Sequence, residues 1–420
     1  MLTQEENETL TRVGPDTPMG KLLREYWHPA CRSEALVAGG APLRIELLCE
    51  KLVAFRSPDG SVGVLEEFCP HRRVSLAIGR NEPGGLRCIY HGWKFDHRGT
   101  AIEVPSEPPE SAEAFRAKVR MKGYPYIESG GVVWVYLGKE QTPPAFPYFE
   151  FTVLPPEQVD VRIGVVNCNW VQGVEGTLDS AHLPYLHRSQ DNGQIANDKL
   201  LADTPAPVFE ISDTPYGFRE GAVRRMKDGR RYVKIREIVA PYYSYVPGFP
   251  ENLANRMVVA SVPFNDTCHA QWHFYYNVQQ PLEPEALQRR WLHSGPDKND
   301  FYADHGGFHD LWKQDRRAMI EGHFSGLVGR YISVEDFIVQ EAMGPILDRS
   351  KEYLGRSDTI IIYMRRKLLN AAKEHLRDGS VWGRSEAEGF DFSSIRSCAV
   401  VLPGEARWQD VDARELLTAA

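Results

Sequence analysis

Residues 69–93 read CPHRRVSLAIGRNEPGGLRCIYHGW, and this stretch decides how the N-terminal part of the chain folds. It carries a cysteine and a histidine at each end, in the pattern C-x-H-x16-C-x2-H. Pro70 stiffens the first loop, and Gly92 lets the backbone of the second loop pass close to a bound group. Each loop therefore offers one thiolate and one imidazole, and a compact β scaffold can present both loops at one tip.

Two cysteines and two histidines, one of each per loop, are the ligands of a Rieske [2Fe–2S] cluster, in which two Cys bind one iron and two His bind the other. A Cys2His2 zinc site is the nearest alternative. Its usual order places both cysteines before both histidines, whereas here the two residue types interleave. Scattered cysteines and histidines without a shared role are the remaining interpretation, and the spacing argues against it.

The surrounding sequence predicts a small all-β domain. Short apolar or alternating segments such as 43–53 and 131–137 are separated by clusters of turn residues. Residues 3–28 predict helices instead, beginning with capping-box spacing at Thr3 and Glu6. The proline-rich stretch 141–156 is the expected linker. We therefore expect N-terminal helices over 1–27, a [2Fe–2S] domain over 28–140 and a larger domain over 141–420.

The larger domain carries a second cluster of metal-binding residue types in the segment DSAHLPYLH, residues 179–187. Asp179 and His182 are spaced to share a helix face. His182 and His187 would lie about 140° apart on an ideal helix, so they can converge only if Pro184 kinks or ends that helix. Two imidazoles and a carboxylate with open positions are typical of non-haem Fe(II) oxygenases. For this motif alone, a helix-end histidine pair with ordinary hydrogen-bond partners is the commoner interpretation.

Composition narrows the class of protein. The chain has 420 residues, of which 42% are apolar and 25% charged, so a disordered or fibrous chain is excluded. A net charge of −8 argues against nucleic acid or an anionic membrane as the main partner. The first residues have no basic start that leads into an apolar stretch, and no apolar run approaches the ~18 residues of a membrane helix. With seven cysteines, an odd number, we expect a cytoplasmic protein without a disulfide framework.

The two cysteine–histidine loops resemble the Rieske domain of bacterial ring-hydroxylating oxygenases, whose pattern runs C-P-H-R and then C-x-Y-H-G-W, as in 69–72 and 88–93. The resemblance extends from Met1 to Arg366 and is to the phthalate 4,5-dioxygenase-like branch, which also includes O-demethylases of lignin-derived aromatic acids. It implies an α+β chain: an N-terminal all-β Rieske domain and a C-terminal helix-grip catalytic domain, an antiparallel sheet with helices.

The resemblance also implies the site residues. The cluster ligands would be Cys69, His71, Cys88 and His91. His182 and His187 would bind a mononuclear iron. Asp179 would not be a ligand but would bridge to a Rieske histidine of the neighbouring subunit, His91, across a trimer contact.

The third iron ligand is expected from a late helix within 331–368, and the position that matches the family is Asp336. Glu335 is the adjacent competitor. Ser333 and Asp336 also have the spacing of a helix N-terminal cap, where acids are common. A further helix is expected over 359–377, and the tail after it is expected to be mostly loop.

An anionic aromatic substrate needs basic partners. Arg224, Arg225, Arg236 and Arg256 lie in the strand region that should wall the pocket, and Arg224 and Arg225 resemble an arginine pair of phthalate dioxygenase. The chain has neither a GxGxxG loop nor a plant-type ferredoxin C-x4-C-x2-C motif. We therefore expect NADH electrons to arrive from a separate flavin- or ferredoxin-type reductase.

These inferences predict a homotrimeric terminal oxygenase that uses O2 and NADH-derived electrons to oxidise an aromatic carboxylate by ring cis-dihydroxylation. The first alternative is a Rieske O-demethylase that releases formaldehyde from a methoxylated lignin-derived acid. The other two are a Rieske electron carrier with an inert C-terminal domain and a structural zinc protein.

Overall fold

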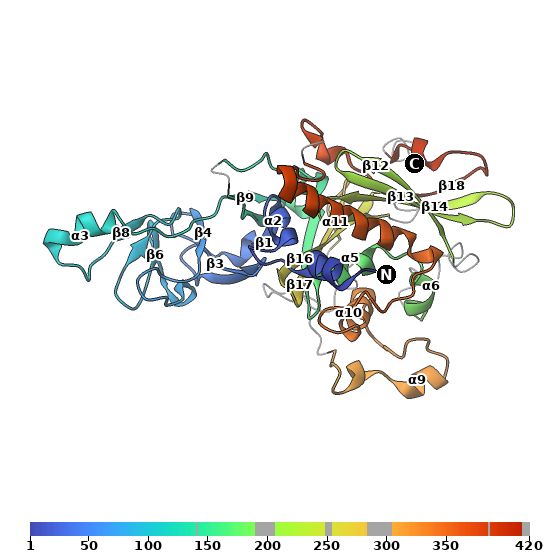
Figure 1. The fold of residues 1–420 in the computed structure, drawn as a ribbon, viewed down its shortest axis with the longest axis horizontal. Coiled ribbons are helices and arrows are strands. Elements are labelled where there is room, and N and C mark those ends of the chain that lie inside the picture. Colours follow the sequence, from blue (N-terminus) through green and yellow to red (C-terminus); the bar gives the residue numbers. More distant parts are fainter. Residues whose placement is uncertain (140–141, 190–205, 248–253, 284–304, 385–386, 414–420) are drawn as a thin grey trace. The chain divides into compact units, whose positions relative to one another are not determined.

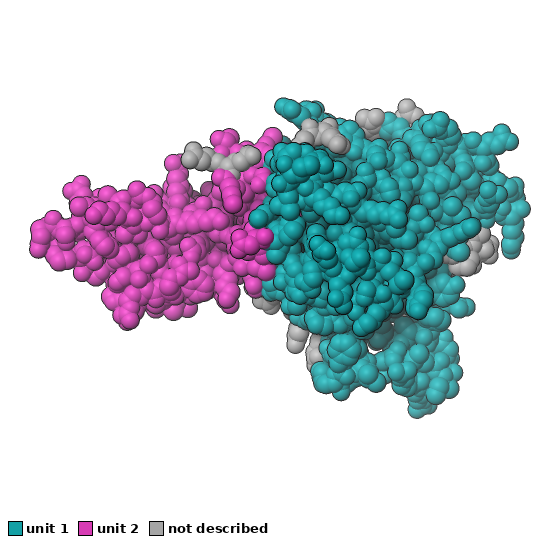
Figure 2. Space-filling model, in the orientation of Figure 1, with its two compact units in different colours: residues 1–13, 17–22, 147–420 teal, residues 14–16, 23–146 magenta. Residues whose placement is uncertain are grey.

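The structure is a computed structural model that describes residues 1–139, 142–189, 206–247, 254–283, 305–384 and 387–413 (Figure 1). The chain forms two compact units (Figure 2). The small unit comprises residues 14–16 and 23–146, and the large unit comprises residues 1–13, 17–22 and 147–420. The predicted boundary between residues 140 and 141 lies outside the described residues.

Two short helices begin the chain, α1 (Gln4–Thr11) and α2 (Pro18–Leu23). The predicted capping box at the start of α1 is present, because the Thr3 hydroxyl accepts from the Glu6 N–H at 3.1 Å and the Glu6 carboxylate accepts from the Thr3 N–H at 2.9 Å. The helical region is shorter than the predicted 3–28, since residues 12–17 are not helical and a strand begins at Trp27.

Three antiparallel sheets make up the small unit. Their strand orders are β1–β10–β9, β2–β3–β4 and β5–β6–β7–β8. The segment 43–53 is a hairpin rather than one strand, because Leu48 and Cys49 adopt left-handed φ values of +51° and +65° and turn the chain. The bounds are β1 (Trp27–Arg32), β2 (Leu43–Leu47), β3 (Glu50–Arg56), β4 (Val62–Glu66), β5 (Arg80–Glu82), β6 (Gly85–Arg87), β7 (Lys94–Phe95), β8 (Ala101–Glu103), α3 (Pro109–Arg116), β9 (Tyr126–Ser129) and β10 (Val132–Tyr136).

An eight-stranded antiparallel sheet forms the body of the large unit, in the order β11–β17–β16–β15–β14–β13–β12 with β18 paired to β14. One edge of β14 pairs along its length with β13, and the other pairs first with β18 and then with β15. The tail that was expected to be mostly loop thus supplies a strand. The bounds are β11 (Val159–Val166), β12 (Val208–Thr214), β13 (Gly217–Arg225), β14 (Arg231–Val239), β15 (Tyr243–Val246), β16 (Asn255–Asn265), β17 (Cys268–Asn277) and β18 (Cys398–Leu402).

Helices pack on this sheet and position the site. α5 (Trp170–Leu178) lies against β16 and β17 and also contacts α10 (Ile332–Ala342) and α11 (Thr359–Asp378). The buried side chain of Gln172 joins α5 to the end of α10, because its amide donates to the carbonyls of Gln340 and Gly344, each at 2.9 Å. The predicted α+β architecture, a β unit followed by an antiparallel sheet with helices, is confirmed. Even the longest described helix, α11, is too polar to cross a membrane.

Candidate metal centres

The two cysteine–histidine loops of the small unit share one backbone geometry. In each loop the cysteine N–H donates to the carbonyl five residues later, at 2.9 Å for Cys69 and 2.8 Å for Cys88. The cysteine carbonyl accepts from the N–H four residues later, at 2.9 and 3.1 Å. That fourth residue has a left-handed φ in both loops, +58° at Arg73 and +76° at Gly92. The loops are therefore a structural pair closed by their own local hydrogen bonds.

The side chains of these loops fit an iron–sulfur cluster. Cys69 and Cys88 are buried, and burial together with the neighbouring Cys88 thiol raises the pKa of Cys69 to about 11. A bound metal reverses such a shift, because it favours the thiolate. The rings of His71 and His91 lie 4.4 Å apart between centroids. Nδ1 of His91 is buried and has no hydrogen-bond partner among the described residues. A metal-binding nitrogen is expected to be in this state, because the metal takes the place of a hydrogen-bond partner.

Aromatic rings hold both loop histidines. The Trp93 indole stacks on the His71 imidazole, with centroids 4.4 Å apart and planes 5° apart, and its Nε1–H donates to the Ser106 hydroxyl at 2.9 Å. The Tyr90 ring lies against the His91 imidazole, with ring centroids 3.9 Å apart. The imidazole orientations are thus set by packing within the small unit.

In the large unit, His182 and His187 lie at the two ends of the single-turn helix α6 (Leu183–Leu186). α5 ends at Leu178 and Asp179 caps it, so the prediction that Asp179 and His182 share a helix face is wrong. The helical conformation is instead interrupted between α5 and α6, and the chain turns again around Pro184. This break brings Nε2 of His182 to 3.2 Å from Nε2 of His187.

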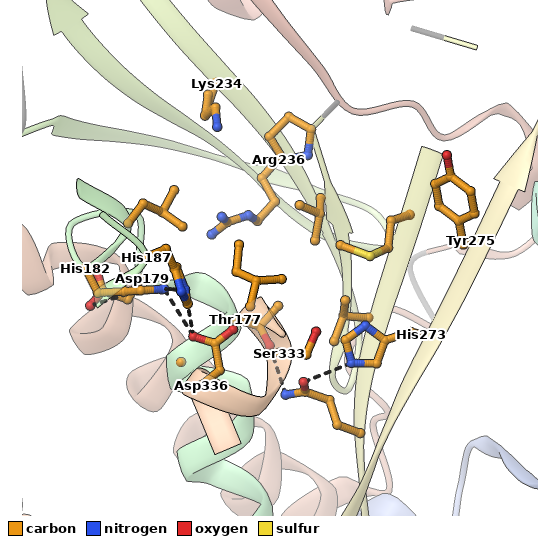
Figure 3. A pocket seen from close by; sticks show the side chains of 18 of the residues that line it. Thr177, Asp179, His182, His187, Lys234, Arg236, His273, Tyr275, Ser333 and Asp336 are labelled. Atoms are coloured by element: carbon orange, nitrogen blue, oxygen red, sulfur yellow. Dashed lines mark hydrogen bonds and ion pairs between the residues drawn. The ribbon is translucent and has the colours of Figure 1, made fainter. Parts of the chain in front are cut away.

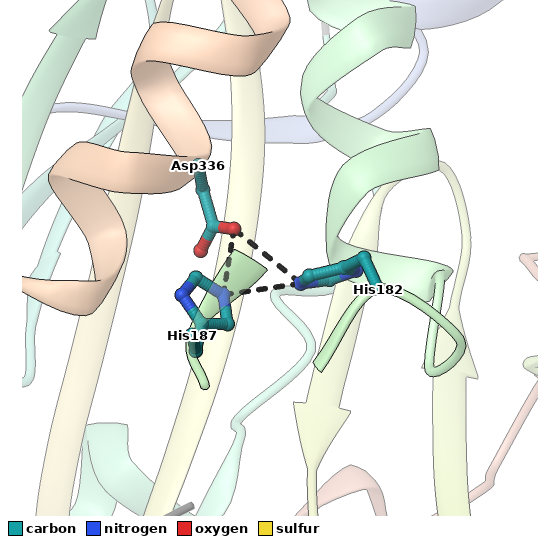
Figure 4. A group of neighbouring side chains, drawn as sticks. All are labelled: His182, His187 and Asp336. Atoms are coloured by element: carbon teal, nitrogen blue, oxygen red, sulfur yellow. Dashed lines mark hydrogen bonds and ion pairs between the residues drawn. The ribbon is translucent and has the colours of Figure 1, made fainter. Parts of the chain in front are cut away.

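Asp336 on α10 completes the group (Figure 4). Its Oδ1 lies 3.4 Å from Nε2 of His182 and 3.0 Å from Nε2 of His187. This is the only group of three such side chains close enough to share an ion that the described residues contain. The alternative interpretation of Asp336 as part of a helix cap is wrong, because Tyr331 is the N-cap and Asp336 lies inside the helix.

The electrostatics of the group favour a bound cation. Burial opposes ionisation of Asp336, but the two histidines outweigh it and hold the pKa of that carboxyl far below its usual range. Burial lowers the pKa of His182, whereas Asp179 and Asp336 outweigh it and raise it to about 9. The carboxylates thus create a negative potential where the two Nε2 atoms meet, and two imidazoles with one carboxylate are the donors of a non-haem iron site.

Each histidine of the triad has a second carboxylate behind it. Nδ1 of His182 lies 3.6 Å from Asp179, whose other oxygen accepts from the Ala181 N–H at 2.6 Å. Nδ1 of His187 lies 2.8 Å from Glu335. Glu335, which the sequence offers as a competing ligand, therefore faces the opposite side of the imidazole from Asp336. Its position next to Asp336 on a helix was the only sequence signal for it.

A cavity of about 250 Å³ opens from the triad (Figure 3). Lys234 and Arg236 of β14 point into it from one wall, and His273 and Tyr275 of β17 lie across the cavity from the triad. Further lining residues include Thr177, Asn255, Arg256, Gln271 and Ser333.

Two of the four arginines singled out from the sequence line this cavity, Arg236 and Arg256. Arg224 and Arg225 do not. Arg224 is buried and donates from Nη2 to the Ser180 carbonyl at 3.1 Å, and Arg225 is exposed at the end of β13. Strand alternation places Arg225 on the opposite face of the sheet from Lys234 and Arg236. Arg224 is paired with Tyr232 and shares their face, but its guanidinium binds the Ser180 carbonyl and does not line the cavity.

Family models match both parts of the chain. Residues 26–125 match the Rieske [2Fe–2S] domain, and residues 135–420 match the model described as LigXa C-terminal domain like.

Curated relatives extend over most of the sequence. The oxygenase subunit of phthalate 4,5-dioxygenase from Pseudomonas putida is 38% identical, covering 99% of this chain and 95% of that one. The oxygenase subunit of 3-chlorobenzoate-3,4-dioxygenase from Comamonas testosteroni is 35% identical over 97% of each chain. The oxygenase subunit of 5,5'-dehydrodivanillate O-demethylase from Sphingobium sp. is 30% identical, covering 88% and 80%.

A solved structure shares the fold. The complex of oxygenase and ferredoxin in carbazole 1,9a-dioxygenase includes a chain that superposes with a TM-score of 0.57 at 18% identity, covering 90% of this chain and 98% of that one.

Proposed function

We propose that this chain, which belongs to the family of Rieske non-haem iron oxygenase components, oxidises an aromatic carboxylate by ring cis-dihydroxylation. Members of the family are oxidoreductases that combine a Rieske cluster with a mononuclear iron and receive NADH-derived electrons from a separate ferredoxin or reductase. The convergence of His182, His187 and Asp336 beside a cavity of about 250 Å³ is the observation that carries the proposal.

The metal ligands follow from the two donor sets. Cys69, His71, Cys88 and His91 hold the cluster, and His182, His187 and Asp336 hold the mononuclear iron. When bound, the cluster supplies electrons and the ferrous ion offers open positions for O2 beside the substrate. The protein orients both imidazoles and places the substrate ring in the cavity.

The charge of the cavity supports an anionic substrate. Glu220 faces two buried arginines, Arg224 and Arg236, and burial raises the pKa of Glu220 to about 7. Arg236 lines the cavity, and Lys234 adds a second cationic side chain to the same wall. Buried cations of this kind stabilise a carboxylate strongly, because few water molecules compete with it. Phthalate and 3-chlorobenzoate, named for two relatives, are aromatic carboxylates.

The active assembly that we propose is a homotrimer in which Asp179 joins His182 of one copy to His91 of the Rieske unit of another. Asp179 suits that role because its side chain keeps 28% of its surface exposed while it contacts His182. A carboxylate that is sealed inside the unit could not reach a second copy.

Substrate oxidation tests the proposal directly. Purified protein with a ferredoxin, a reductase and NADH is supplied with phthalate, 3-chlorobenzoate or methoxylated benzoates, and O2 uptake is compared with formaldehyde release. We expect O2 uptake coupled to a cis-dihydrodiol without formaldehyde. Stoichiometric formaldehyde from a methoxylated acid would favour O-demethylation, the second candidate, which the 30% identical O-demethylase relative supports. Absence of coupled O2 uptake on every acid would contradict both.

The cationic wall of the cavity, formed by Lys234 and Arg236, is tested separately. Arg236→Gln removes a charge-assisted contact to the substrate, so we expect KM to rise roughly 10–100-fold with a smaller change in kcat. Arg225→Gln, on the neighbouring strand but outside the cavity, is expected to leave KM unchanged. If Arg225→Gln raises KM instead and Arg236→Gln does not, the pair predicted from the sequence binds the substrate and the cavity assignment is wrong.

A further inference from the structure

The two triad histidines differ in the carboxylate behind them. Asp179, behind His182, keeps 28% of its side chain exposed, whereas Glu335, behind His187, keeps 1%. The His187–Glu335 contact is also the shorter, at 2.8 Å against 3.6 Å. Glu335 therefore has no route to a second copy or to solvent, and its role must lie within the large unit.

Both oxygens of Glu335 have defined donors. Oε2 lies 2.8 Å from Nδ1 of His187, and Oε1 accepts from the Ser325 hydroxyl at 3.2 Å. Ser325 is itself fixed, since its oxygen accepts from the Leu327 N–H at 3.3 Å. The carboxylate plane is thus held from both ends, on the side of His187 that faces away from the triad.

We propose that Glu335 is the positioning residue of the mononuclear site: it accepts the Nδ1–H of His187 and thereby keeps the Nε2 lone pair directed at the metal. The inference rests on the proposed function, because it requires His187 to be a ligand. A neutral imidazole has one N–H and one lone pair, so a carboxylate at Nδ1 selects the tautomer that leaves Nε2 free.

The position of Glu335 and Asp336 on one helix restricts the orientation of the His187 ring. Glu335 and Asp336 are neighbours on α10, and they approach the two nitrogens of one imidazole, Nδ1 at 2.8 Å and Nε2 at 3.0 Å. A shift of the ring toward either carboxylate would shorten one contact and lengthen the other. His187 is therefore fixed between two adjacent side chains of a single element.

A structural role is the competing explanation, and α10 offers a matched control for it. Glu341 is also a buried acid of α10 with several donors, among them the Asn167 N–H at 2.9 Å and Nε2 of His305 at 3.2 Å. It is not part of the triad or of the cavity lining. Glu341→Gln therefore disturbs a similar buried acid without touching His187.

The experiment uses the full-length protein with its Rieske cluster intact, after the mononuclear iron has been replaced by Co(II). Co(II) affinity is measured by equilibrium dialysis, and the electron paramagnetic resonance (EPR) signal of Co(II) is recorded with the cluster oxidised. We expect Glu335→Gln to weaken Co(II) binding about 10–100-fold and to change the Co(II) signal, as outer-shell carboxylate variants do. Glu341→Gln should lower the melting temperature yet keep the affinity and the signal.

Each result has one meaning. Wild-type affinity and signal in Glu335→Gln, or equal losses in both glutamine variants, would overturn the inference. If Glu335→Gln fails to fold, Ser325→Ala decides, because it frees only one carboxylate oxygen: a change in the Co(II) signal supports the inference and an unchanged signal overturns it. If Asp336→Ala binds Co(II) like the wild type, the proposed metal site itself is wrong, which is a separate failure.

Discussion

The two proposed metal centres are built in opposite ways. In the small unit, two loops close on themselves through backbone bonds from Cys69 and Cys88, and each loop delivers one thiolate and one imidazole. In the large unit, His182 and His187 come from a helix break, whereas Asp336 comes from a helix much later in the chain. The first site is therefore a local structure and the second depends on how α5 packs against α10.

This difference determines what each site is sensitive to. A local site is damaged mainly by changes in its own loops. A site assembled from distant elements is also damaged by changes in the residues that hold those elements together, even when they contact no ligand. This contrast is tested by comparing variants of ligand residues with variants of supporting residues.

The largest effect is expected from Cys88→Ser, which removes a proposed ligand of the cluster. We expect the visible absorption of the cluster to vanish, iron content to fall from about three to about one per chain, and coupled O2 uptake to stop. Cys31→Ser changes another buried cysteine of the small unit, on β1, and should leave the cluster intact. Retention of all the iron by Cys88→Ser would show that Cys88 is not a ligand.

Asp179→Asn should come next. The amide keeps the size of the side chain and an oxygen that can still accept from the Ala181 N–H, but the negative charge beside His182 is lost. We expect both centres to stay loaded while coupled turnover falls about 100-fold. Iron content, cluster absorption and product per NADH are the measurements. Wild-type turnover with both centres loaded would rule out Asp179 as the bridge.

Gln172→Leu tests the supporting contacts of the iron site. It leaves the carbonyls of Gln340 and Gly344 and the N–H of Leu347 without their partner, so the free energy of unfolding of the large unit should fall by about 3 kcal/mol. Fe(II) affinity should weaken as α5 and α10 loosen, while the cluster absorption of the folded protein is unchanged. Loss of the cluster at a temperature where the variant is still folded would contradict the contrast between a local and an assembled site.

The same contrast explains what the sequence could predict. The cysteine and histidine spacing in residues 69–93 is enough to indicate the cluster, because loop and ligands are contiguous. The hairpin within 43–53 was missed, since nothing in the residue types of Leu48 and Cys49 signals a left-handed turn. β18 was missed for a different reason: its pairing with β14 joins distant segments, and no local pattern encodes that.

At the iron site, the sequence could name ligand types but not their surroundings. His182 and His187 are identified through the family resemblance, since their spacing alone favours an ordinary histidine pair. Their convergence depends on the break after α5. The cavity residues Lys234 and Arg236 could not be ranked above Arg224 and Arg225. Residue types do not reveal that Arg225 lies on the other face of the sheet, or that Arg224 binds the Ser180 carbonyl and does not line the cavity. Glu335 was visible only as a neighbour of Asp336.

The smallest effect that still distinguishes the regions is expected from Trp93→Phe. This variant keeps an aromatic ring over His71 but loses the indole N–H bond to Ser106, so the unfolding free energy should fall by about 1 kcal/mol. Trp134→Phe is the matched control, because Trp134 is buried in the same unit and its indole donates at 3.0 Å to the Ser129 carbonyl, away from both loops. We expect similar stability losses in the two variants, but a changed EPR spectrum of the reduced cluster only in Trp93→Phe, whose smaller ring holds His71 less firmly. Identical cluster spectra in both variants would show that the loop backbone fixes the His71 imidazole without help from the Trp93 ring. The site of the small unit would then depend on its two loops alone.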